Sequence, residues 1–364
     1  MSARTPSLAL LRALPKVDLH RHLEGAFRIE TLWDFHCRNR QRLHASFAAL
    51  QAACTVPPGQ RPGFRGFLAR FSGLRFRYGG PDAIERLAAE AVADAAADGV
   101  AHLELRFSPP FAARRMKEPL PPDTAGSAVD TLAEVELAAD AVVRGARREA
   151  ARLGISVAFV VTLNRNYSLA VNRPAVQLLM RPVGAALSGL DLAGDETLPA
   201  RFFADFFRQW KAAGRGITIH AGEDARAGGA DNVRQALTQF GADRIGHGVR
   251  AWEDGRLVAA LANKRVTLEL CPTSNVQTRA CPSFRAHPLK ALLAAGVPAT
   301  INTDDPATSR TTLSREYLRA AVNCGLGWSA LRSCALHAAH AAFLSPAARD
   351  ALAERLSAAW PVTL

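Results

Sequence analysis

The chain has 364 residues, of which 49% are hydrophobic and 21% charged, which excludes a fibrous, disordered or disulfide-rich protein. Its formal net charge of +12 comes almost entirely from scattered arginines, because only five lysines are present. No dense basic run exists, so we expect no nucleic-acid partner. We see no signal peptide and no membrane span, and the six cysteines form no C-x-x-C pair. We therefore predict a cytoplasmic protein without a membrane partner.

Short β-branched runs alternate with Ala- and Leu-rich stretches along the whole chain. We predict strands near residues 17–22, 102–107, 155–161, 187–192, 216–220, 244–247, 266–270 and 298–303. We predict helices between them at 82–97, 128–152, 200–213, 231–240, 254–262 and 287–295. Alternation of strands and helices favours an α/β protein with a parallel sheet, and eight such units favour a single (β/α)8 TIM barrel over residues 1–364. An open doubly wound sheet is the alternative, but it would gather its site at one switch point.

A long connection, residues 31–81, follows the first strand. Its apolar residues, interrupted by Pro57-Pro58-Gly59, indicate a helical insertion: Phe64, Phe67, Leu68, Phe71 and Phe76. An insertion after the first strand lies at the carboxyl end of a barrel, where active sites form. We therefore predict a helical lid over the mouth. The alternative is an ordinary insertion that packs its own apolar face.

Four predicted strands end in residues that bind metals or transfer protons. Side chains alternate along a strand, so His20 and His22 point the same way. A barrel would bring these two residues together with His220, His247 and Asp304. Three neutral imidazoles and one carboxylate suit a borderline-soft divalent metal, most often zinc. The predicted ligands are His20, His22, His220 and Asp304.

The remaining histidines do not end a predicted strand. We expect them to be hydrogen-bonded core residues: His36, His44, His102, His287, His337 and His340.

Three further residues are candidates for acid–base chemistry. Glu223 lies three residues beyond His220 and can exchange a proton beside a metal site, although it could instead be an acid at a helix N-terminus. His247 lies between two glycines, which let the backbone approach a ligand. Asp305 follows a predicted ligand and could orient the attacking water. It could also be a helix N-cap, because Pro306 follows it.

Seven segments, in order from residue 15 to residue 306, together resemble the adenosine deaminase family of metal-dependent hydrolases. They are Pro15–Gly25, Leu103–Pro109, Asp191–Glu196, His220–Glu223, Ile245–Gly248, Cys271–Asn275 and Asn302–Pro306.

The resemblance implies one Zn²⁺ per chain, held by the four predicted ligands. It implies that Glu223 donates a proton to purine N1, and that His247 and Asp305 position and help deprotonate the water that attacks C6. Ammonia then leaves. The backbone N–H of Gly194 would bond purine N3, and Glu24 would contact the ribose 5′-hydroxyl. His22 and Asp305 are also expected to contact the substrate.

Two departures from the family pattern concern the substrate. Most adenosine deaminases have Asp where this chain has Glu24, and Glu there resembles adenine deaminases and some bacterial relatives. Residues 163–167 also depart from the well-known members. We predict deamination of adenosine or deoxyadenosine. The alternatives are adenine, or a larger adenine nucleoside such as aminodeoxyfutalosine.

Other classes of protein are less well supported. A dinuclear hydrolase of this superfamily would need a bridging Lys at the end of the fourth strand, where residues 191–196 contain none. A base-flipping zinc deaminase would need a Pro-Cys-x-x-Cys segment, which is absent from the sequence. A non-catalytic binding relative would be expected to lack a ligand or Glu223, and all are present.

Overall fold

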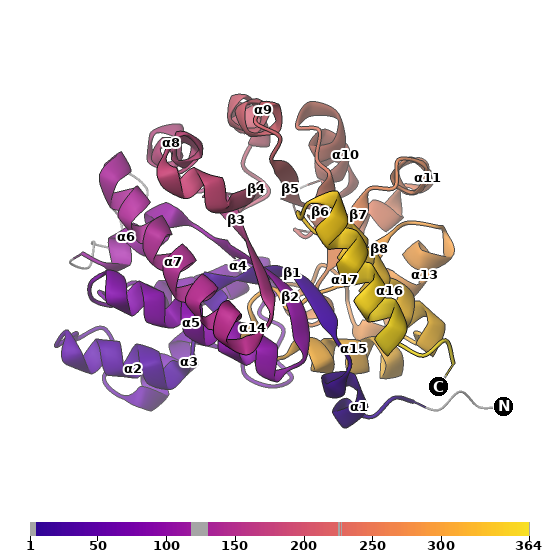
Figure 1. Ribbon diagram of the computed structural model, residues 1–364, viewed down its shortest axis with the longest axis horizontal. Helices are drawn as coiled ribbons and strands as arrows, with labels where there is room; N and C mark the ends of the chain where they lie inside the picture. Colours follow the sequence, from indigo (N-terminus) through magenta and orange to yellow (C-terminus); the bar gives the residue numbers. More distant parts are fainter. Residues whose placement is uncertain (1–4, 118–129, 225, 227, 364) are drawn as a thin grey trace.

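The computed structural model describes residues 5–117, 130–224, 226 and 228–363 (Figure 1). Eight parallel strands pair in chain order: β1 Lys16–His22, β2 Val100–Phe107, β3 Ser156–Asn164, β4 Leu187–Ala193, β5 Gly216–Ala221, β6 Arg244–His247, β7 Thr267–Leu270 and β8 Ala299–Ile301. Beyond the end of β8, Asp304 N–H donates to the carbonyl of His20 at 2.7 Å, and His22 N–H donates to the carbonyl of Asp304 at 2.8 Å. These bonds bring the first strand to the last, so the sheet is a nearly closed barrel. The predicted (β/α)8 fold is confirmed, and the doubly wound alternative is wrong.

Helices surround the strands, as Figure 1 shows. The main ones are α5 Pro81–Ala97, α7 Leu132–Leu153, α8 Leu169–Gln177, α9 Ala204–Ala212, α10 Ala230–Gln239, α11 Gly255–Asn263, α13 Leu289–Ala294, α15 Leu313–Val322, α16 Trp328–Ala341 and α17 Pro346–Ala359. The predicted helix at 128–152 begins at Leu132, because Thr131 and Glu134 form a capping box there. Residues 128 and 129 of that prediction lie outside the described residues.

Short helices follow several strands at the mouth of the barrel: α6 Pro109–Arg115, α12 Pro272–Gln277 and α14 Pro306–Ser309. The helix α1 Leu8–Ala13 precedes β1. Within the described residues, no helix combines the length and the hydrophobicity that a bilayer crossing demands.

The insertion after β1 is helical, with α2 Ile29–Arg38, α3 Phe47–Cys54, α4 Gly63–Leu68 and the 3₁₀ segment η2 Ala69–Leu74. Four of its predicted apolar residues line the cavity at the barrel mouth: Phe64, Phe67, Leu68 and Phe71. Phe76 instead packs inside the insertion against the His36 and Tyr78 rings. The segment therefore has its own small core and also forms a wall of the cavity. That it closes as a lid stays a prediction.

Candidate active site

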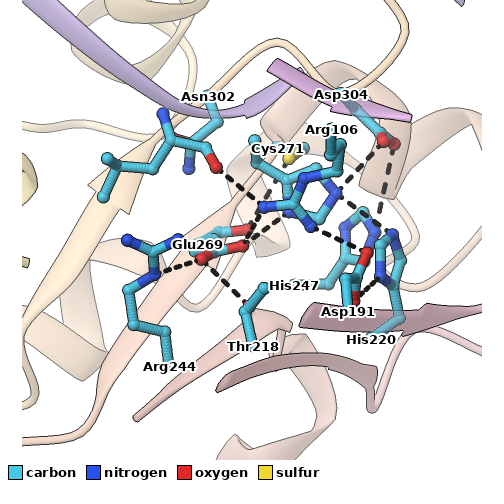
Figure 2. Close-up of polar contacts among 12 residues, drawn as sticks. Arg106, Asp191, Thr218, His220, Arg244, His247, Glu269, Cys271, Asn302 and Asp304 are labelled. Carbon is cyan, nitrogen blue, oxygen red and sulfur yellow. Dashed lines mark hydrogen bonds and ion pairs between the residues drawn. The ribbon is translucent and has the colours of Figure 1, made fainter. Parts of the chain in front are cut away.

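The four predicted ligands converge at the carboxyl ends of β1, β5 and β8. The Nε2 atom of His220 lies 3.1 Å from Nε2 of both His20 and His22. The Oδ1 atom of Asp304 lies 3.4 Å from Nε2 of His20 and 3.5 Å from Nε2 of His22. Asp304 holds the left-handed backbone conformation, with φ of +61°, which turns its carboxylate toward the histidines. Figure 2 shows this carboxylate beside His220 and His247.

These atoms fit a divalent metal. Tetrahedral zinc with bonds of about 2.1 Å places its ligand atoms about 3.4 Å apart, close to the separations observed here. The Nδ1 atoms of His20 and His220 lie 2.9 Å from Glu269 and Asp191, which fixes their protons on Nδ1. Their Nε2 atoms therefore face one another, and a cation between them would stabilise this arrangement. Burial holds the pKa of His22 well below its usual range, which keeps its imidazole neutral and able to bind a metal.

A charged cluster inside the barrel orients these histidines. Arg106 donates to Glu269 at 2.7 Å and to Asp191 at 3.2 Å, and Arg244 donates to Glu269 at 2.6 Å (Figure 2). Burial alone would raise the pKa of Glu269, but Arg106 and Arg244 hold it well below its usual range. Glu269 therefore remains a carboxylate, and it accepts a hydrogen bond from His20 Nδ1. No role is predicted from the sequence for Arg106, Arg244 or Glu269, because charged residues inside a strand carry no motif of their own.

A second chain of hydrogen bonds fixes His247, the last residue of β6, which has a left-handed φ of +60°. The N–H of Leu289 donates to His287 Nδ1 at 3.2 Å, so the His287 proton is on Nε2 and faces Asn275 Oδ1 at 3.2 Å. The Asn275 amide nitrogen then donates to His247 Nδ1 at 2.9 Å. His247 must therefore carry its proton on Nε2, which lies 3.3 Å from Glu223. His287 is thus a hydrogen-bonded core histidine, as predicted.

The other five histidines were given the same prediction. His36, His44, His102 and His337 make hydrogen bonds. For His340 the prediction is wrong, because this side chain is exposed near the end of α16.

The Glu223 side chain lines the cavity, and hydrogen bonds to the backbone of its loop hold it in place. It lies in the loop between β5 and α10, seven residues before that helix begins at Ala230, so it is not an N-terminal helix acid. The carboxylate of Glu196, which follows β4, accepts the N–H groups of Gly222 at 2.8 Å and of Glu223 at 3.0 Å. Burial, together with Asp304 and Glu196, raises the pKa of Glu223 well above its usual range. The site therefore favours the protonated form of this side chain.

Asp305 lines the same cavity as Glu223 and Asp304. It occupies the N-cap position before Pro306, but its side chain makes no capping hydrogen bond. Its buried Oδ1 atom has no partner among the described residues. Burial, with Asp304, Glu24 and Glu223 nearby, raises the pKa of Asp305 well above its usual range. A Cβ atom on Gly25 would lie 1.9 Å from Asp305 Oδ1, so glycine is required there.

A cavity of about 260 Å³ opens from this group toward the insertion. His22, Glu24 and Gly194 line it, as expected for substrate contacts. Gly194 has a φ of +101°, and a Cβ atom there would collide with the side chains of Asn164 and Asn166. Glu24 accepts the N–H of Ser108 at 2.6 Å, and burial raises the pKa of Glu24 to about 7.

The divergent segment after β3 also belongs to this site. Asn164, Asn166 and Tyr167 line the cavity, whereas Arg165 turns away and donates to the carbonyl of His220 at 2.8 Å. The segment that departs from the family pattern is therefore positioned to contact substrate.

The barrel and the metal-fitting group are those of a metal-dependent hydrolase. The family model for adenosine deaminase matches residues 15–359. An adenosine deaminase from Shewanella loihica is 33% identical over 341 residues, which cover 93% of this chain and 97% of that protein. The chain belongs to the adenosine deaminase family, and it is a metal-dependent hydrolase that deaminates a 6-aminopurine.

Two solved structures are similar over nearly their whole length. An amidohydrolase from Burkholderia ambifaria with bound zinc has a TM-score of 0.82 and 25% identity, covering 98% of this chain and 97% of that one. The adenine deaminase of Arthrobacter aurescens has a TM-score of 0.79 and 21% identity, covering 95% of this chain and 98% of that one. The second likeness concerns the fold alone.

Proposed function

We propose that this protein hydrolyses adenosine or deoxyadenosine to inosine or deoxyinosine and ammonia, with one Zn²⁺ per chain. His20, His22, His220 and Asp304 would hold the zinc. Zinc at such a site supplies Lewis acidity, which makes water a nucleophile at neutral pH. The six free cysteines suit a reducing compartment, so a cytoplasmic location is part of the proposal.

Glu223 acts as the proton donor. Its raised pKa keeps a proton available, and transfer of that proton to purine N1 makes C6 electrophilic. The backbone bonds to Glu196 fix the loop from which Glu223 reaches the base. The N–H of Gly194, which also lines the cavity, would bond purine N3 and fix the orientation of the ring.

His247 and Asp305 act on the water. Both lie beside Asp304, and His247 presents its Nε2 proton to the same space. In its ionised form Asp305, whose Oδ1 has no partner among the described residues, accepts a proton from the water as the water oxygen bonds to C6. Asp305 then passes this proton to the amino group, the C6–N bond breaks and ammonia leaves, while the proton of the new C6 hydroxyl returns to the Glu223 carboxylate.

The observation that carries this proposal is the convergence of Glu223, His247 and Asp305 on the four metal-fitting atoms. The variant Glu223→Gln tests it, because an amide cannot supply the proton. We expect it to fold, to retain one zinc by elemental analysis and to lose roughly 10²–10⁴-fold in kcat for adenosine. Turnover close to wild type would contradict the assigned role.

One feature of Glu24, the length of its side chain, favours a second candidate function, which is deamination of adenine. Its side chain is longer than the aspartate common in adenosine deaminases and narrows the sugar end of the cavity. One oxygen of Glu24 accepts the Ser108 N–H, and the other can accept a ribose hydroxyl. A buried acceptor left unpaired costs about 1–3 kcal/mol, so we expect adenosine to be preferred over adenine.

The comparison is kcat/KM for adenosine and adenine in wild type and in Glu24→Asp. If wild type prefers adenine and the shorter side chain moves the preference toward adenosine, the adenine deaminase alternative is correct.

A further inference from the structure

The segment from Leu74 to Tyr78 presents one arginine to the catalytic cavity. Leu74, Phe76 and Tyr78 are buried, and Arg75 is half-buried between them. The carbonyl of Leu74 accepts hydrogen bonds from Arg115 Nη1 at 3.0 Å and from the Tyr78 hydroxyl at 3.1 Å. The Tyr78 N–H donates to the carbonyl of Arg115 at 2.7 Å. The backbone on both sides of Arg75 is therefore fixed to α6.

Arg75 lines the cavity but lacks an internal counter-ion. Across residues 5–117, 130–224, 226 and 228–363, no carboxylate forms an ion pair or hydrogen bond with its guanidinium. The neighbouring cavity wall is aromatic, with contributions from Phe64, Phe67, Phe71, Phe111 and Tyr167. A guanidinium beside an apolar wall, partly removed from water, is costly unless an anion accompanies it.

Arg115 adds a second positive charge near Arg75, behind the Phe111 ring of the cavity wall. It is buried, and its guanidinium lies 4.8 Å from the centre of the Phe111 ring that lines the cavity. Its Nε atom has no hydrogen-bond partner, and no carboxylate pairs with it among the described residues. Burial lowers the pKa of Arg115, and Arg75 is one of the positive neighbours that add to this effect. The nearby Glu24 carboxylate accepts a backbone N–H and pairs with neither arginine.

We propose that Arg75, supported by the charge of Arg115, binds an anionic group on the sugar-side substituent of the substrate. This inference rests on the proposed function, because the residues around Glu223 hold the amino end of the purine and direct its other end toward the insertion. A guanidinium donates two parallel hydrogen bonds to a phosphate or a carboxylate. The aromatic residues of the wall then pack against the apolar parts of the substituent.

The test compares four substrates: adenosine, adenosine 5′-monophosphate, adenosine 5′-carboxylate and the neutral 5′-methylthioadenosine. We expect wild type to favour the phosphate or the carboxylate over both neutral compounds by at least about tenfold in kcat/KM. The two anionic compounds show which group fits. Arg75→Gln should lose roughly 10- to 100-fold for the preferred anion and little for adenosine.

Arg65→Gln is the matched control, because Arg65 belongs to the same insertion, is exposed and does not line the cavity. Binding of inosine 5′-monophosphate, inosine 5′-carboxylate and inosine, measured by calorimetry, gives a second readout that needs no turnover. We expect the preferred anion to bind more tightly than inosine in wild type and in Arg65→Gln, and this difference to vanish in Arg75→Gln.

Equal kcat/KM for neutral and anionic nucleosides, with Arg75→Gln affecting them alike, would overturn the inference and leave the deaminase proposal intact. Deamination of adenine alone would instead contradict the nucleoside proposal. If adenine alone is deaminated, the calorimetric measurement still tests the anion site, and equal affinity for the three inosine compounds would contradict it.

Discussion

Glu196 shows how a residue away from the reacting atoms can set the geometry of catalysis. Its two carboxylate oxygens accept the N–H groups of Gly222 and Glu223, and the Asn232 amide donates to one of them at 3.1 Å. The loop that carries Glu223 is therefore pinned from the neighbouring strand. Because Glu196 does not line the cavity, it is a positioning residue.

We expect Glu196→Gln to lower kcat by roughly tenfold or more, because its NH₂ group would face a backbone donor and release the loop. KM and zinc content should change little. Asp195→Asn is the matched control, since Asp195 bonds Thr197 and contacts this loop through the Arg226 side chain at 3.5 Å, whereas it accepts neither the Gly222 nor the Glu223 N–H. In the Glu223→Gln background, Glu196→Gln should have no further effect on kcat. A fully additive loss would show that Glu196 acts elsewhere.

At the scale of elements, the alternation of strands and helices was enough to predict the barrel and nearly every strand position. That the four predicted ligand residues lie together could also be predicted, because strand ends meet at one mouth. The network behind them could not be predicted in the same way. Arg106 and Glu269 lie within strands, and only their pairing across the barrel explains how such charges are buried. One signal in the sequence could have indicated this network. A parallel sheet buries both faces of its strands, so a charged residue inside such a strand needs a buried partner of opposite charge.

The hydrogen-bonded chain from α13 to β6 carries a pH dependence. Burial lowers the pKa of His287 to about 4, and the unfolded value is about 6.5. Between these values the unfolded state binds more protons than the folded state, so stability rises with pH. The neutral His287 contributes up to about 3 kcal/mol to the free energy of unfolding. This contribution is complete above pH 6.5 and is lost as the pH falls toward 4.

We therefore expect His287→Gln to flatten the dependence of the melting temperature on pH between about 4 and 6.5. The exposed His340→Gln serves as the control and should retain the wild-type slope. Unchanged slopes in both variants would mean that His287 does not carry this dependence. The same variant should lower kcat, because Asn275 loses the partner that orients its amide toward His247.

At the scale of the whole molecule, the barrel and the metal site contribute separately to stability. The apolar core between strands and helices does not include the four predicted metal ligands. We expect chelation to abolish turnover, retain the far-ultraviolet circular dichroism of a folded barrel and lower the melting temperature. Elemental analysis should give one zinc per active chain. Two metals, or full activity without any, would contradict the mononuclear site.

His247 and Asp304 both hold left-handed backbone conformations, which cost a residue with a side chain of order 1–3 kcal/mol. Glycine would relieve that cost at either position but would remove the imidazole or the carboxylate. Selection for thermal resistance alone would therefore favour replacing these two residues early, and would do so at the expense of chemistry. In a directed-evolution campaign on this barrel, two of the sites at which glycine would raise the melting temperature are therefore among those that must be held constant.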